Sequence, residues 1–352
     1  MLEKKMKTKL NILKAHHGDS IIIETYDSSN KTFTILIDGG PRETFRTTLV
    51  HELDRYKTID LIILTHIDHD HISGLIQYLC SSHAGKHQFD KILINAPNLL
   101  KVSTGGTQIT IDEGIEFERL IYSEYPNLKV ISEVTSDTII NLNLPDGIEI
   151  KILSPNKYSL DELYDNWTEV DLSEDGATQI SNEDINAKDY NVDFKSLANN
   201  IDVEKSIKKD FVNASSIAFS IRTLDFHGLF LGDSHSTIVA EGLSNSYPNQ
   251  NPILFDYVKL SHHGSKYNIS NKFLDSIECY NYIVSTNGGK GRAKHPDRQT
   301  IAKIVKHKNM QKSKVQFYFN YPLAEVEIKT GKLFKEEELE LFDCHDKNEF
   351  TI

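Results

Sequence analysis

Three histidines and two aspartates fill five of the six positions from His66 to His71, within the stretch LTHIDHDHISGL. Neutral imidazole and carboxylate groups are the ordinary ligands of Zn²⁺ and related divalent ions. Four of the side chains are spaced so that alternate residues can face two different ions: His66, Asp68, Asp70 and His71. A polar loop whose histidines serve only as hydrogen-bonding groups is the alternative, but the density of ligand-type residues favours one half of a dinuclear metal site.

Two later segments offer the remaining ligands that such a site needs. Asp233 lies in LFLGDSH, and His262 and His263 lie in VKLSHHGS; both segments follow an apolar run. An aspartate in a turn after a strand needs no metal to explain it. Two adjacent histidines before a glycine are rarer, and they favour a ligand role.

Short apolar runs separated by turn residues must position these groups. They predict β-strands within residues 9–15, 20–26, 32–40, 60–66, 91–97, 129–134, 148–155, 216–223, 228–234, 257–264, 280–289, 315–320 and 324–330. Apolar residues at helical spacing predict helices over 41–56, 72–79, 113–125, 237–243 and 297–307. Many short strands with helices between them favour the α/β class, with sheets packed face to face and covered by helices. The histidine cluster then lies in a strand-to-helix loop, where side chains from several strand ends can converge.

Composition limits the classes of protein to consider. The chain has 352 residues, 39% hydrophobic and 26% charged, which is ordinary for a globular protein. No stretch approaches the roughly 18 to 20 apolar residues of a membrane span, and the N-terminal MLEKKMKTKL lacks the apolar core of a signal peptide. The three cysteines are far apart and form no CxxC pair, which argues against a disulfide framework or a thiolate zinc site. We therefore expect a cytoplasmic protein that does not bind a membrane.

Charge bears on the partners of the chain. The net charge of −12 gives no global basic footprint for nucleic acid, so contact with DNA would need a local basic groove. Residues 157–211 carry 14 Asp and Glu against six Lys, a net charge of −8. This acidic insertion is either a solvated loop or small helical excursion, or a lid or binding site for a protein partner.

The ordered motifs resemble the metallo-β-lactamase superfamily: Asp38-Gly39-Gly40, then THxDxDHxxGL, then Gly232-Asp233, then HHGS from His262 to Ser265. Within that superfamily the chain is similar to the metallo-hydrolase domain of the DNA-internalisation competence protein ComEC, through GDSIIIE, LIDGG, NASSIAFSI and a late His295-Pro296 in the same order. The resemblance covers nearly the whole chain. It implies a single αββα sandwich over residues 1–352, with 157–211 inserted in it, and hydrolysis by a metal-bound hydroxide.

Carried over residue by residue, the resemblance assigns the ligands. His66 and Asp68 would bind the first ion, Asp70 and His71 the second, and Asp233 both. His262 or His263 would complete the shell, with His263, next to Gly264, favoured.

Two departures from the superfamily pattern matter. An aspartate, Asp68, stands at the second place of the usual HxHxDH, and no histidine occurs between His87 and His227, so the middle histidine ligand of the superfamily is missing. Asn213, Ser215 or Ser216 are candidates for that place. Such an oxygen-rich set tilts the expected pair of divalent ions toward Mn²⁺ while leaving Zn²⁺ open.

Several other residues receive expected roles. Asp70 would orient the nucleophile, and His295, in GRAKHPD, would protonate the leaving oxygen or hold a phosphate. Asp38 would orient a ligand histidine. Four cationic residues would pair with substrate charge, although solvated surface positions are their ordinary alternative: Lys266, Lys290, Arg292 and Lys294.

Three functions follow from this reading. The first is a metal-dependent phosphodiesterase, most simply a nuclease acting on DNA, because paired metals suit an in-line displacement at phosphorus. The second keeps the metals but acts on a small phosphoester or a lactam-type ring amide, since fold does not fix function. The third is an effector subunit of a bacterial anti-phage system, gated by a partner that binds the acidic insertion.

Overall fold

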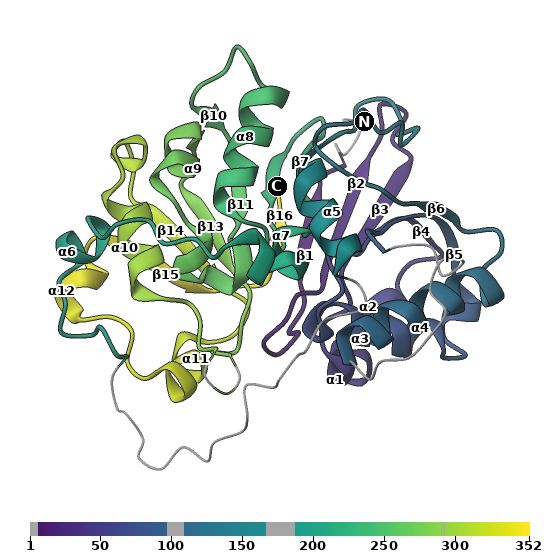
Figure 1. The fold of residues 1–352 in the computed structure, drawn as a ribbon, viewed down its shortest axis with the longest axis horizontal. Coiled ribbons are helices and arrows are strands. Elements are labelled where there is room, and N and C mark those ends of the chain that lie inside the picture. The colour runs from purple at the N-terminus through teal and green to yellow at the C-terminus, as the bar shows by residue number, and fades with distance from the viewer. Residues whose placement is uncertain (1–5, 97–108, 167–186, 290, 292) are drawn as a thin grey trace, which may run out of the picture.

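Two sheets lie between two layers of helices in the computed structural model, which describes residues 6–96, 109–166, 187–289, 291 and 293–352 (Figure 1). The first sheet has seven strands, in the spatial order β16 (Glu349–Thr351), β1 (Lys9–Ile12), β2 (Ile21–Tyr26), β3 (Thr32–Ile37), β4 (Thr58–Ile63), β5 (Gln88–Leu93) and β6 (Lys129–Ile131). The second also has seven, in the order β15 (Phe342–Asp346), β14 (Val315–Phe319), β13 (Asn281–Val284), β11 (Tyr257–Lys259), β9 (His227–Phe230), β8 (Ala218–Arg222) and β7 (Glu149–Ser154). A short parallel pair joins β10 (Ile253–Leu254) to β12 (Ile277–Glu278).

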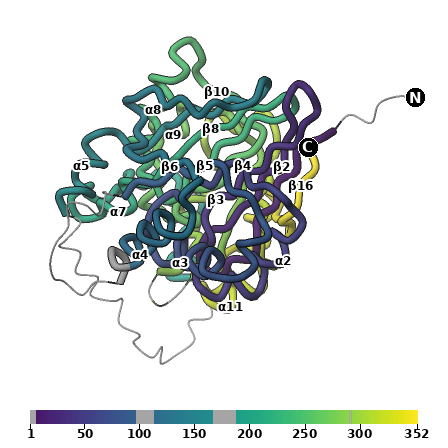
Figure 2. Tube along the Cα trace, turned by 90° about the vertical axis from the view of Figure 1, so that its right-hand side faces the viewer, coloured from purple at the N-terminus to yellow at the C-terminus, as the bar shows by residue number. Residues whose placement is uncertain are grey.

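Helices cover the outer face of each sheet. Those on the side of the first sheet are α1 (Arg42–Thr44), α2 (Val50–Leu53), α3 (His69–Leu79) and α4 (Ile109–Glu124), and Figure 2 shows α2, α3 and α4 from that side. A π-helical segment, Phe45–Leu49, joins α1 to α2. On the side of the second sheet lie α8 (Ser236–Ser246), α9 (Asn271–Ser276) and α10 (Arg298–Lys306). The remaining helices are α5 (Lys157–Asp165), α6 (Phe194–Ala198), α7 (Phe211–Ala214), α11 (Leu323–Thr330) and α12 (Glu336–Leu339).

The apolar runs of the sequence are buried on both faces of each sheet. Successive side chains of a strand point to opposite faces. In β2, Ile21 and Ile23 therefore enter the core between the sheets, while Ile22 enters the core under the helices of the first sheet. In β9, Leu229 packs toward the helices of the second sheet and Phe230 toward the central core. The three resulting cores make the αββα sandwich that the resemblance implies.

The strand expected at 324–330 is wrong, because this segment is helix α11. Its alternation of apolar and charged residues fits a half-buried strand, yet Pro322 stands at the N-cap of a helix. In the helix only Val326 and Thr330 are buried, which is the spacing of one helical face. The short C-terminal strands β15 and β16, at the edges of the two sheets, were not among the predicted strands.

The parallel strands of both sheets place polar loops at their carboxyl ends. Strands β3, β4, β5 and β6 pair in parallel in the first sheet, as do β9, β11, β13, β14 and β15 in the second. Loops that follow such strands meet at one edge of a sheet. Asp38 follows β3, the histidine cluster follows β4, Asp233 follows β9 and the His-His pair follows β11.

The acidic insertion is described at its two ends. Helix α5 begins it, and the segment from Ala187 to Lys205 returns along the second sheet's helices through α6. Phe194 and Leu197 of α6 are buried in the core of the second sheet. Among the described residues, no helix is long and apolar enough to cross a membrane.

Candidate metal centre

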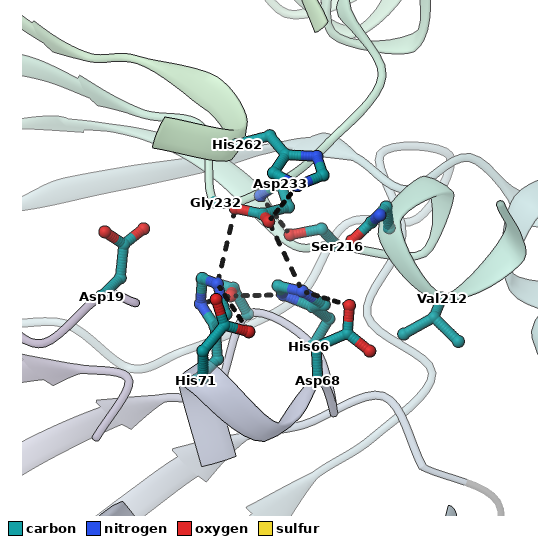
Figure 3. A network of polar contacts seen from close by, with 12 residues as sticks. Asp19, His66, Asp68, His71, Val212, Ser216, Gly232, Asp233 and His262 are labelled. Carbon is teal, nitrogen blue, oxygen red and sulfur yellow. Dashed lines mark hydrogen bonds and ion pairs between the residues drawn. The ribbon is translucent and has the colours of Figure 1, made fainter. Parts of the chain in front are cut away.

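The three ligand-bearing segments meet between the ends of the two sheets (Figure 3). Asp233 lies at their centre and is only 2% exposed. Four imidazoles face it through their Nε2 atoms: His71 at 3.5 Å, His262 at 3.7 Å, and His66 and His263 at 3.9 Å each. The sequence left the choice between His262 and His263 open, and the structure brings both to Asp233.

The other two aspartates divide the imidazoles into two groups. Asp68 Oδ2 lies 3.5 Å from His66 Nε2. Asp70 lies 3.5 Å from His263 Nε2 and 4.0 Å from His71 Nε2. The ligand atoms of His66, His71 and Asp233 lie within 4.8 Å of one another, and so do those of Asp70, His71 and His263. Asp68 extends the first group through its contact with His66, and His262 extends it through its contact with Asp233. Asp233 contacts rings of both groups.

His69, the remaining histidine of the cluster, has other partners. Its Nδ1 lies 3.1 Å from Glu113 Oε1 on α4 and 2.8 Å from Ser73 Oγ. These contacts attach the start of α3 to α4. Within the cluster, the side chain of His69 therefore points to the helix layer, while those of His66, Asp68, Asp70 and His71 point to the centre.

The buried polar atoms fit a bound cation. The Nε2 atoms of His66, His71 and His263 and the Oδ1 atom of Asp233 are buried and have no hydrogen-bond partner among the described residues. Buried polar atoms are ordinarily paired, because an unpaired one loses its hydration without compensation. Nitrogen and carboxylate oxygen atoms that converge in this way are the ligand set of a divalent ion.

Neighbouring groups fix the orientation of two ligand rings. Asp38 accepts hydrogen bonds from the Thr65 amide and hydroxyl, both at 2.7 Å, and from Nδ1 of His71 at 2.8 Å. His263 donates through Nδ1 to the carbonyl of Ser285 at 2.8 Å. With Nδ1 protonated in this way, Nε2 of each ring presents its lone pair to the centre.

The charges of the centre shift its pKa values in opposite directions. Burial alone would lower the pKa of His71 and of His263, but the surrounding carboxylates raise the first well above its ordinary range and the second to about 9. Burial alone would raise the pKa of Asp70 and Asp233, but the imidazoles lower both. Burial lowers the pKa of His262 to about 4, against the charge of Asp233. Protons and cations therefore compete for the ligand atoms of His71 and His263, whereas His262 is neutral at pH 7.

The backbone takes unusual conformations at this site. Asp38, His262 and His263 have φ values of 55°, 45° and 54°, in the left-handed region that non-glycine residues rarely adopt. Such residues cluster at functional sites, where the surrounding structure enforces them. At Gly18, an added Cβ would lie 1.8 Å from the carbonyl oxygen of Asp70, so only glycine permits this close approach.

The three candidates for the place of the missing middle histidine differ in their hydrogen bonds. Ser216 Oγ accepts a hydrogen bond from the Asp233 amide at 3.0 Å, and Ser215 Oγ donates to the Val212 carbonyl at 2.7 Å. Asn213 donates through Nδ2 to Asp210 at 3.0 Å, while its buried Oδ1 has no partner among the described residues. Of the three candidates, Asn213 alone keeps a buried acceptor unpaired.

Sequence reasoning missed an ion pair behind the second group. Asp19 and Lys259 are both 1% exposed and contact each other. The other oxygen of Asp19 lies 3.6 Å from His263 Nδ1. A signal was available, since Lys259 interrupts the apolar strand YVKL. A lysine at such a position is almost never buried without a partner. Asp210, which lies 3.0 Å from His235, was also missed.

A cavity of about 590 Å³ opens beside the centre. His262 and His295 line it, and their ring centroids are 5.2 Å apart. His295 Nδ1 lies 3.4 Å from Asp297 Oδ2. Of the expected substrate-binding residues, Lys266 and Lys294 line this cavity, while Arg292 and its neighbour Lys290 lie outside the described residues.

Comparison with known proteins gives a distant likeness to solved structures. No protein-family model and no curated protein matches the chain. The metallo-beta-lactamase fold protein YhfI from Bacillus subtilis is 11% identical with a TM-score of 0.43, and the match covers 98% of this chain and 99% of YhfI. Zn²⁺-bound PqqB from Methylobacterium extorquens is 11% identical with a TM-score of 0.39, and the match covers 98% of this chain and 100% of PqqB. A diphosphatase of the PhnP family is 12% identical with a TM-score of 0.42, and the match covers 98% of each chain. The fold assignment rests on the two sheets and their helices.

Proposed function

We propose that this chain is a metal-dependent hydrolase that cleaves phosphodiesters, with DNA as its macromolecular substrate. The observation that carries the proposal is the buried Asp233 carboxylate, which four imidazole nitrogens approach within 3.9 Å. The order of motifs that resembles the ComEC hydrolase domain supports a phosphodiester over an amide.

The two groups of ligands would each hold one divalent ion. His66, Asp68 and His262 suit one ion, Asp70, His71 and His263 suit the other, and Asp233 is shared. A bound pair of such ions would polarise phosphoryl oxygens and lower the pKa of water toward neutrality. Three of the ligands are carboxylates, which favour Mn²⁺ over Zn²⁺ because Zn²⁺ prefers softer nitrogen and sulfur ligands.

The residues of the cavity have separate tasks in this proposal. Asp297 Oδ2 lies 3.4 Å from His295 Nδ1 and would stabilise the protonated ring, from which the other ring nitrogen would give its proton to the leaving oxygen. Lys266 and Lys294 line the same cavity and would neutralise phosphate charge. A small phosphoester is the second candidate substrate, which the limited volume of the cavity favours.

Elemental analysis of the purified chain, paired with hydrolysis assays, tests the proposal. Metal-stripped protein is restored with Mn²⁺ or Zn²⁺ and assayed on bis-p-nitrophenyl phosphate and on single- and double-stranded DNA. We expect nearly two ions per chain and hydrolysis restored by one of the metals. Asp70→Ala should abolish hydrolysis while circular dichroism shows a retained fold. Bound metal without hydrolysis of any phosphodiester would overturn the proposal, and no bound metal would also overturn the ligand assignment.

A further inference from the structure

The cavity beside the centre is positively charged in a chain of net charge −12. Four lysines line it against two aspartates, and the lysines are Lys188, Lys205, Lys266 and Lys294. Within the described part of the chain, only Lys205 among these four forms an ion pair, at 3.1 Å from Asp210. Charge of one sign gathered in a recess concentrates ligands of the opposite sign there.

One wall of the cavity comes from the returning part of the acidic insertion. Two buried cations of α10 hold this wall in place. Arg298 donates to the Asp189 carbonyl and, at 3.0 Å, to that of Val192. Lys303 donates to the Asn200 carbonyl at 2.7 Å and lies 2.6 Å from Asp202. Because its backbone groups are bound by cations that are 1% and 2% exposed, the wall is anchored to α10 and bounds the cavity.

An aromatic ring stands among the lysines. Tyr267 lines the cavity, and the ammonium of Lys266 lies 5.4 Å from the centroid of its ring. A ring beside a cation is the usual means by which proteins hold one base and its phosphate, since every base can stack on an aromatic face. A volume of about 590 Å³ suits one ligand of nucleotide size and does not suit a length of duplex.

We propose that this cavity binds one nucleotide unit next to the scissile phosphodiester, with Tyr267 stacking on the base and Lys266 and Lys294 contacting phosphate. The inference rests on the proposed phosphodiesterase function and narrows its substrate. A nucleotide unit with a free end is offered by the end of a single strand or by a dinucleotide. An internal position of a duplex or of a closed circle has no free end, so one nucleotide would have to be extruded from its strand to enter, and we expect such positions to be disfavoured.

The test uses the full metal-loaded chain and four substrates: bis-p-nitrophenyl phosphate, a dinucleotide, a linear single-stranded oligonucleotide and a closed single-stranded circle. We expect the first three to be hydrolysed and the circle to resist. The double variant Lys266→Ala, Tyr267→Ala should lower the ratio of kcat/KM for the dinucleotide to that for bis-p-nitrophenyl phosphate by about 10-fold or more. Lys195→Ala, an exposed lysine of α6 outside the cavity, is the matched control and should leave the ratio unchanged.

The outcomes separate the two proposals. Cutting of the closed circle as fast as of the linear strand, or an unchanged ratio in the double variant, would overturn the nucleotide cavity while the phosphodiesterase function stands. Hydrolysis of the dinucleotide but not of the linear strand would identify a small nucleotide as the source of the unit, and the reverse would identify a strand end. A chain that cleaves none of the four substrates with either metal would overturn the proposed function itself.

Discussion

Chelating the divalent ions should produce a protein whose free energy of unfolding falls as the pH rises from 6.5 to 9. His263 is the residue to follow. Burial opposes its protonation, but the carboxylates of Asp233 and Asp19 raise its pKa to about 9, from an ordinary value near 6.5. A group with a raised pKa in the folded state stabilises that state fully below its unfolded pKa, and the contribution is lost as the pH passes the folded value. At about 1.4 kcal/mol per pH unit, this shift corresponds to about 3 kcal/mol from one side chain.

The metal-loaded protein should follow the opposite trend over the same window. Its imidazoles must be neutral to bind, so ion affinity and stability should rise with pH. Urea unfolding at pH 6, 7, 8 and 9, with and without chelator, measures both trends. The control is His263→Gln, which should remove most of the fall in the stripped protein. A stripped wild-type protein whose stability is flat or rises between pH 6.5 and 9 would show that the buried carboxylates do not hold a proton on this ring.

Three substitutions and one control substitution test other parts of the centre. Asp233→Asn should reduce bound ions, by elemental analysis, from nearly two per chain to less than one, because both ligand groups share this carboxylate; unchanged stoichiometry would contradict the shared role. Gly18→Ala would place a Cβ 1.8 Å from the Asp70 carbonyl and should weaken metal binding by about 10-fold in a competition titration. Gly85→Ala meets no atom within 4 Å and should bind metal as the wild type does. In the metal-loaded protein, where His263 must be neutral to bind, Lys259→Met leaves the buried Asp19 without a cation and should lower the free energy of unfolding by about 4 kcal/mol; a loss below about 1 kcal/mol in urea would refute the pairing.

The sequence was informative where one strand end carries several chemical groups. The loop after β4 follows an apolar run and contains a dense set of histidines and aspartates, so the position of the loop and its candidate ligands were predictable together. That both His262 and His263 contact Asp233 was not predictable, since it depends on two consecutive left-handed φ values that turn both rings toward this carboxylate. No local pattern reports such a backbone.

The two other failures have different causes. The partner of Lys259 is 240 positions away at Asp19, so the pair appears only when the two sheets are stacked. The segment at 324–330 has the alternation of a strand, but the N-cap Pro322 and the burial of only Val326 and Thr330 correspond to a helix. The ion pair depends on tertiary packing, whereas the helix begins at a proline beside the segment, a local signal that the prediction of a strand overlooked.

The insertion shows a similar limit. Its charge predicted a solvated excursion or a partner site, yet Phe194 and Leu197 belong to the core of the second sheet. A deletion of residues 157–211 would remove these side chains together with one wall of the cavity. A partner that binds the insertion is therefore better tested by substituting its exposed charges, such as Lys195, than by removing the segment.

The candidate ligands come from both sheets, four from the loop after β4 and three from the loops after β9 and β11. His66 to His71 follow the first sheet, while Asp233, His262 and His263 follow the second. An ion bound among them would cross-link two positions about 160 residues apart, Asp70 and Asp233. A cross-link over a loop of this length lowers the conformational entropy of the unfolded chain, which corresponds to more than about 4 kcal/mol of stabilisation. Neither half alone has a complete set of ligands. Metal binding would consequently require both sheets to be packed together, so hydrolytic activity would belong to the fully folded chain alone.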